Sequence, residues 1–195
     1  MKHRTAKPFE PAMRFFTPEL YVRFNSADDD VAEQANGEWE LALSQYRAHL
    51  DGMHDQMPSS VKMLSGLCLH DADFLACEQK VEPFYSLPIE PFVVPAAWTA
   101  MAIVSVKQDD HFTSLIYRLW DHVREFTAID DWPFSKVRTH WLYDEIDKVA
   151  DHPGEFLHRV MLSDGRVLEI PFVSAVIHSV PLPRPVEGRE VRQIA

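Results

Sequence analysis

Residues 156–172, FLHRVMLSDGRVLEIPF, decide the fold of this chain. Two apolar runs, 156–162 and 167–172, flank the turn Ser163-Asp164-Gly165-Arg166. An Asp-Gly pair between two such runs is the strongest short-range signal for a β-hairpin. The stretch therefore predicts two antiparallel strands joined by a tight turn.

Short β-rich runs on both sides extend this hairpin into a sheet. In residues 137–149, Leu142 and Ile146 alternate with Tyr143, Glu145 and Asp147, a pattern typical of a half-buried strand with one solvated face. We expect the remaining strands over residues 98–106, 112–120, 123–129 and 173–180, with 123–129 paired to 112–120.

The first third of the chain predicts helices. Thr17 and Pro18 suit the start of a short helix that ends near Asn25. Ser26 with Asp29 approximates a capping box and opens a long helix over about residues 27–57. Residues 59–60 then cap a shorter helix that reaches about residue 67. The long helix is predicted from apolar residues at steps of three or four: Val31, Ala35, Trp39, Leu43, Tyr46, Leu50, Met53 and Met57.

Helices first and strands afterwards indicate an α+β fold, with the long helix packed on an antiparallel sheet of about six or seven strands. We expect one domain over residues 14–180, helical in 14–67 and β-rich in 68–180. Residues 1–13 are predicted to be a mobile lead and residues 181–195 a loose tail rich in proline and charge.

Composition narrows the functional classes. The net charge of -11 and pI of about 5.3 disfavour binding to nucleic acid or anionic membranes and would suit a basic partner. Two cysteines are too few for a disulfide framework. No apolar segment follows the charged N-terminus as in a signal peptide, and no run is long enough to span a bilayer. We therefore expect a cytoplasmic protein.

Residues 68–78, CLHDADFLACE, are the densest cluster of chemically versatile side chains. His70, Asp71 and Asp73 can offer nitrogen and oxygen ligands to a metal ion, with His178 or Glu145 as a further ligand. The His-Asp pair resembles the central dyad of the metal phosphohydrolases. The alternative, which we prefer, is a turn over residues 70–73 that leads into a strand. Asp71 would then accept backbone N–H bonds and His70 would bridge to a carbonyl.

A second candidate site lies on the predicted strand 137–149. Tyr143 and Glu145 share a face and can line a groove with His158 or Glu169 from neighbouring strands, and Trp141 can stack on a ligand. The alternative is an ordinary solvated sheet face. The sequence shows no Gly-rich phosphate loop, no Gly-x-Ser-x-Gly and no Cys-x-x-Cys, so no cofactor is expected.

Residues 16–21 (FTPELY), 69–72 (LHDA) and 141–146 (WLYDEI) together resemble an uncharacterised bacterial family, one of the domains of unknown function. The similarity extends from about Arg14 to His178 and departs from the pattern in the proline-rich segment 83–95. It implies a shared architecture and brings no activity, cofactor or partner.

Three functions follow as expectations. The first is a non-enzymatic cytoplasmic binding or interaction protein, for example an immunity or antitoxin protein that blocks a basic toxin. The second is a metal-dependent hydrolase that uses His70, Asp71 and Asp73. The third is a homo-oligomeric module in which strands 98–106 and 173–180 are edges that pair across a two-fold axis.

Overall fold

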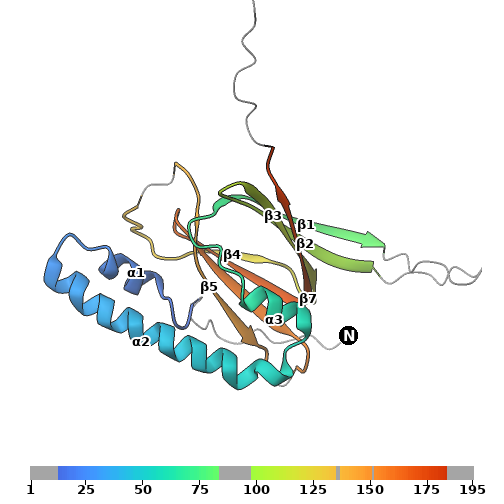
Figure 1. Cartoon of the computed structure of the whole chain (residues 1–195), viewed down its shortest axis with the longest axis horizontal. Helices are drawn as coiled ribbons and strands as arrows, with labels where there is room; N and C mark the ends of the chain where they lie inside the picture. The colour runs from blue at the N-terminus through green and yellow to red at the C-terminus, as the bar shows by residue number, and fades with distance from the viewer. Residues whose placement is uncertain (1–12, 84–97, 135–136, 151, 184–195) are drawn as a thin grey trace, which may run out of the picture.

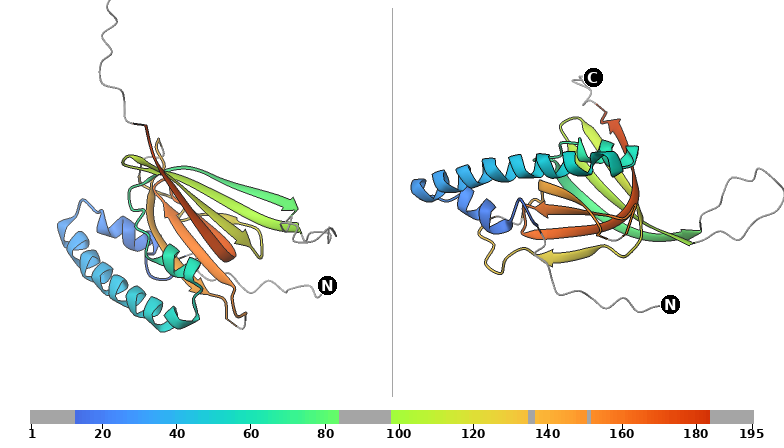
Figure 2. Two further views of the ribbon diagram at one scale, coloured as in Figure 1. Left: turned by 45° about the vertical axis from the view of Figure 1, so that its right-hand side comes forward. Right: turned by 90° about the horizontal axis from the view of Figure 1, so that it is seen from below.

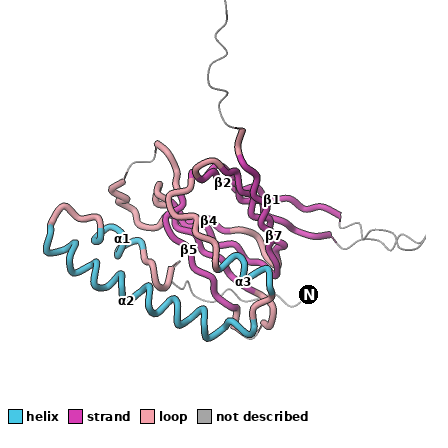
Figure 3. The backbone as a smooth tube through the Cα atoms, viewed as in Figure 1, coloured by secondary structure: helices cyan, strands magenta, loops and turns pink. Residues whose placement is uncertain are grey.

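The computed structural model describes residues 13–83, 98–134, 137–150 and 152–183, and it confirms the predicted α+β fold (Figure 1). Helices come first along the chain and an antiparallel sheet follows. Figure 3 shows the helices in cyan and the strands in magenta. The helical elements are α1 Pro18–Phe24, α2 Asp29–Met53, the 3₁₀ turn η1 His54–Gln56 and α3 Ser59–Ser65. The strands are β1 Asp73–Pro83, β2 Trp98–Gln108, β3 His111–Leu119, β4 Arg124–Thr127, β5 Trp141–Lys148, β6 Phe156–Leu162 and β7 Arg166–Pro181.

The helix starts follow local capping chemistry. The Thr17 hydroxyl accepts a hydrogen bond from the Leu20 N–H, as predicted. The predicted Ser26 cap of the long helix is wrong, because the Asp28 carboxylate accepts from the N–H groups of Asp30 and Val31. The carboxylate carries a full charge, which suits the positive end of the helix dipole better than a hydroxyl does.

The sheet has the strand order β1-β2-β3-β7-β6-β5, and every pair is antiparallel. The hairpin predicted at residues 163–166 joins β6 to β7, and Gly165 adopts a φ of 86° there. The two strands predicted at 167–172 and 173–180 form one strand, because a bulge opposite residues 118–119 bends β7 without ending it. The predicted partner of residues 123–129 is wrong, since β4 pairs with the first part of β7.

The sheet curls so that the start of β1, at one end of the strand order, meets the start of β5, at the other end (Figure 2). The N–H of Asp71 donates to Trp141 O at 2.9 Å, the N–H of Trp141 donates to Ala72 O at 2.9 Å, and the N–H of Phe74 donates to Thr139 O at 2.8 Å. We call this short ladder the seam. It joins segments that are far apart in the sequence and fixes the curvature of the sheet.

Two apolar clusters lie on opposite faces of β5. Ile146 belongs to the inner cluster, which contains Tyr117, Phe156 and Phe172 and is covered by residues of α3. Tyr143 packs against the second cluster, which α1 and the first half of α2 cover. Met13 is 1% exposed in this second cluster, so the predicted mobile lead is wrong at that residue. Residues 1–12, and residues 184–195 of the predicted tail, lie outside the described part of the chain.

Helix α2 covers the outer edge of β5. The Tyr46 hydroxyl accepts from the Ile146 N–H at 2.9 Å, and His49 Nε2 lies 3.2 Å from Ile146 O. An edge strand presents unpaired N–H and C=O groups, which can recruit another strand. At Ile146 two side chains of α2 satisfy both groups.

Two glycines should respond oppositely to alanine. A Cβ at Gly165 would lie 2.6 Å from Trp132 Cγ, at a φ that L-residues rarely adopt, so we expect Gly165→Ala to lower the free energy of unfolding by about 2 kcal/mol or more. A Cβ at Gly37 in α2 would have no atom within 4 Å. Because alanine favours the helix more than glycine does, Gly37→Ala should raise the free energy of unfolding by about 0.5–1 kcal/mol. Denaturant unfolding measures both, and shifts in the same direction would contradict this hairpin geometry.

Candidate functional site

The predicted metal-binding motif lies at the seam. His70 Nδ1 is 2.7 Å from Leu142 O, so the prediction that His70 bridges to a carbonyl agrees with the structure. The predicted role of the Asp71 carboxylate is not seen, since this side chain is 77% exposed and lies 3.5 Å from His70 Nε2. Asp71 contributes its backbone instead, with a φ of 64° and its N–H in the seam.

The structure separates the proposed metal ligands. Asp73 Oδ1 lies 3.3 Å from His140 Nδ1, and Asp73 Oδ2 lies 3.9 Å from Lys107 Nζ. His178 is on β7, three strands from β1, which is about 14 Å at the usual strand spacing. In the described ranges, no group of three or more His, Cys, Asp or Glu side chains is placed to hold a metal ion. The metal-dependent hydrolase stays a prediction.

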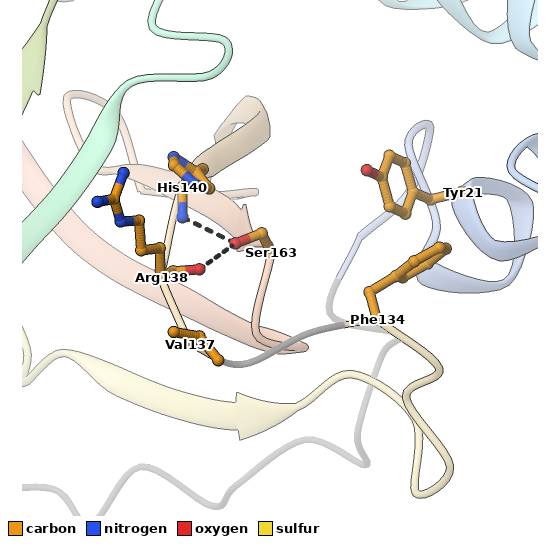
Figure 4. Close-up of a pocket in the computed structure, with 6 residues that line it drawn as sticks. All are labelled: Tyr21, Phe134, Val137, Arg138, His140 and Ser163. Carbon is orange, nitrogen blue, oxygen red and sulfur yellow. Dashed lines mark hydrogen bonds between the residues drawn. The ribbon is translucent and has the colours of Figure 1, made fainter.

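A shallow hollow of about 400 Å³ opens beside the seam (Figure 4). Tyr21 and Phe134 lie on one side of it, and His140 and Ser163 lie on the other. The Ser163 hydroxyl accepts from the His140 N–H at 2.8 Å and donates to Arg138 O at 3.2 Å. These two bonds join the β6–β7 turn to residues 138–140. Because the hydroxyl proton is donated to a carbonyl, Ser163 is not arranged as a nucleophile.

The sheet face predicted to be solvated is buried. Glu145 is fully buried on this face. Trp141 and His158 are 1% exposed and belong to the opposite, inner face, so His158 does not line a groove with Tyr143 and Glu145. Tyr143 is half-buried and its ring lies 4.4 Å from that of Trp39 on α2. The prediction failed because the helices pack on this face, which the alternation within β5 does not reveal.

Glu145 holds the segment that leads into α1. Its Oε1 accepts from the N–H groups of Phe15 at 2.6 Å and Phe16 at 2.7 Å, and its Oε2 accepts from the N–H of Arg14 at 2.8 Å. We call this arrangement the Glu145 clamp. Burial raises the pKa of Glu145, and the three N–H donors oppose that rise because they favour the carboxylate.

A row of alternating charge crosses four strands beside the clamp. Arg159 on β6 stands between Glu145 and Glu169, and Glu169 also stands opposite Arg124 on β4. Arg159 Nε and Arg124 Nη1 each lie 3.1 Å from a carboxylate oxygen of Glu169, and Arg159 also bonds Asp147. Arg159 and Glu169 are 7% and 8% exposed. The buried Arg159 and Glu169 therefore each have a partner of opposite charge, which is what burial requires.

His158 belongs to a polar chain inside the inner cluster. Its Nδ1 lies 2.8 Å from the Tyr117 hydroxyl and its Nε2 lies 3.0 Å from Asp144 Oδ2, while the Trp141 indole donates to Asp144 Oδ1 at 3.0 Å. Burial holds the pKa of Tyr117 well above its ordinary value. His158 is 1% exposed and both of its nitrogens are engaged within the fold, so it stabilises the core.

Comparisons with protein-family models, with curated proteins and with solved structures give no match in any of the three. The resemblance to a bacterial domain of unknown function stays a prediction. Of the helices in the described residues, none has the length and apolar character needed to cross a membrane.

Substitutions at Asp71 distinguish a backbone role from a ligand role. A positive φ costs alanine about 1 kcal/mol or more, so Asp71→Ala should lower the free energy of unfolding by that amount. Asp71→Asn and Asp71→Gly tolerate this conformation and should stay close to wild type. Unfolding curves and elemental analysis of the purified proteins measure this. A bound metal that all three variants lose would instead make the carboxylate a ligand.

Proposed function

We propose that the chain is a non-enzymatic interaction protein that binds an extended protein segment along one edge of β7. The observation that carries the proposal is the part of β7 over residues 173–181, which we call the open edge. Strand β6 pairs with β7 only as far as Phe172. Beyond that residue, the described strands cover β7 on the β3 side alone.

The ladder alternation identifies the backbone groups at the open edge. The Leu182 N–H donates to Asp110 O on the β3 side. Antiparallel pairing alternates direction with each residue, so the N–H groups of Val180 and His178 also point toward β3. Those of Ile177 and Ser179 therefore point away from the sheet. These outward groups are the template on which an added strand forms.

Among the described strands, the edges of β5 and β1 are protected in ways that the open edge does not share. Helix α2 satisfies β5 at Ile146, and β1 carries the exposed charges Glu78 and Lys80. Charged residues make up 25% of the chain, yet residues 173–180 (VSAVIHSV) contain no Asp, Glu, Lys or Arg. Charges at an edge normally discourage strand addition. Their absence from this run supports an edge that is used for binding.

The outer face beside the open edge offers apolar contacts for alternate side chains of an added strand. Ile103, Ile116 and Val176 stand directly opposite one another on β2, β3 and β7. Val176 is 61% exposed and Val180 is 38% exposed. In strand addition, backbone bonds supply affinity and such side-chain contacts supply specificity. The expected ligand is an extended segment with apolar residues at every second position.

A displayed library of random peptides tests this function. Peptides selected on the full chain should alternate apolar and polar residues and should slow amide exchange at Ile177 and Ser179. Their affinity should fall at least about tenfold for Ser179→Pro, because proline removes an outward N–H and leaves the β3 ladder in place. Ser179→Ala is the matched control, since it keeps that N–H.

Peptides that bind Ser179→Pro as tightly as wild type would overturn the proposal, as would a selection that yields no binder. Thermal unfolding of both variants first shows that they fold.

A basic partner is a second candidate, and α2 is the surface that favours it. Asp29, Asp30, Glu33, Glu40 and Asp51 are exposed on this helix, against one exposed cation, Arg47. Association driven by this face weakens as salt screens the charges, whereas strand addition at the uncharged open edge does not. Salt dependence therefore separates the two candidates.

A further inference from the structure

We propose that the segment bound at the open edge is β7 of a second copy of this chain, paired antiparallel across a two-fold axis at His178. This inference rests on the proposed function and names its partner. The sequence-based expectation that residues 98–106 form an edge is wrong, because β2 lies between β1 and β3. The expectation of an edge over residues 173–180 agrees with the structure.

The geometry of the open edge selects the axis. A two-fold axis perpendicular to the sheet keeps the outer faces of both copies on the same side. Side chains on the outer face of one copy therefore meet side chains on the outer face of the other. Val176, His178 and Val180 are the exposed side chains on the outer face of this stretch. The series valine, histidine, valine is the same in both chain directions. An axis at His178 places Val176 opposite Val180 of the second copy, twice, and the two His178 side chains opposite each other.

This register also satisfies the outward backbone groups. Ile177 of each copy stands opposite Ser179 of the other, so each N–H donates to the facing carbonyl. Pro181 has no N–H and falls at the end of the pairing, opposite Ala175, where the missing donor interrupts no inner bond.

Repulsion between two copies is weakest at this edge. Each copy carries a net charge of -11, so most surfaces of two copies repel. The open edge contributes no acidic side chain and lets the copies approach with little local repulsion. The outer row of Ile116 and Val176 then continues into Val180 and Phe112 of the second copy. A paired stretch of this length buries less than a standard interface of about 1,600 Å², so the dimer should be weak and concentration-dependent.

Analytical ultracentrifugation of the full chain, with a chelator present, tests the dimer. We expect a monomer–dimer equilibrium that strengthens with added salt, because salt screens the repulsion between copies. Ser179→Pro should weaken dimerisation at least about tenfold, and Ser179→Ala should leave it close to wild type. A wild type that stays monomeric at every concentration would overturn the inference, as would a Ser179→Pro dimer as tight as wild type.

Acidification tests the position of the axis. The groups that face His178 are Ser114 directly across on β3, with Phe112 and Ile116 beside it, and none of these titrates. Protonation of both His178 side chains would place like charges opposite each other across the axis. The wild-type dimer should therefore weaken as the pH falls, relative to His178→Asn. An equal pH response of the two proteins would place the axis elsewhere and contradict this register.

The two proposals can fail separately. If the chain is monomeric but library peptides still protect Ile177 and Ser179 from exchange, the second copy is not the partner and the proposed function stands. If a dimer forms that neither Ser179→Pro nor acid weakens, and peptides bind elsewhere, the open edge is not an interaction surface and both proposals fail.

Discussion

The arrangement of the helices on the sheet depends on the hydrogen bonds that the Glu145 carboxylate accepts. Three consecutive N–H groups, from Arg14 to Phe16, donate to its two oxygens. Burying a carboxylate is costly, and charge-assisted hydrogen bonds of this kind offset the cost. The clamp fixes Phe16, the residue before the Thr17 cap. Helix α1 begins directly after this point and α2 follows it, and both pack against β5.

Closure of the sheet follows from this docking. With α2 in place, Tyr46 and His49 reach the backbone of Ile146 and cover the β5 edge. The seam holds the start of β1 against residues 139–141, so the curled sheet is tied at that end. Among the described strands, residues 173–181 of β7 then form a long edge that carries no Asp, Glu, Lys or Arg side chain. The proposed interaction surface is thus a consequence of how the other edges are closed.

Local signals in the sequence predict most of the helices and strands, whereas long-range contacts are not readable from it. The Asp-Gly turn and the apolar steps of α2 predicted the hairpin and the long helix because both depend on neighbouring residues. The sequence predicts a solvated Glu145, since alternation within β5 shows two faces but not that helices cover both. The pairing of β4 with β7 and the row through Arg159 likewise join residues that no local pattern connects.

Amide hydrogen exchange at Arg14, Phe15 and Phe16 tests the clamp most directly. The measurement compares wild type with Glu145→Met, which keeps the length of the side chain but removes both acceptor oxygens, and with Glu78→Met, the same change at an exposed position. We predict slow exchange of the three amides in wild type and in Glu78→Met, and exchange faster by at least about tenfold in Glu145→Met. Equal protection in all three proteins would contradict the account.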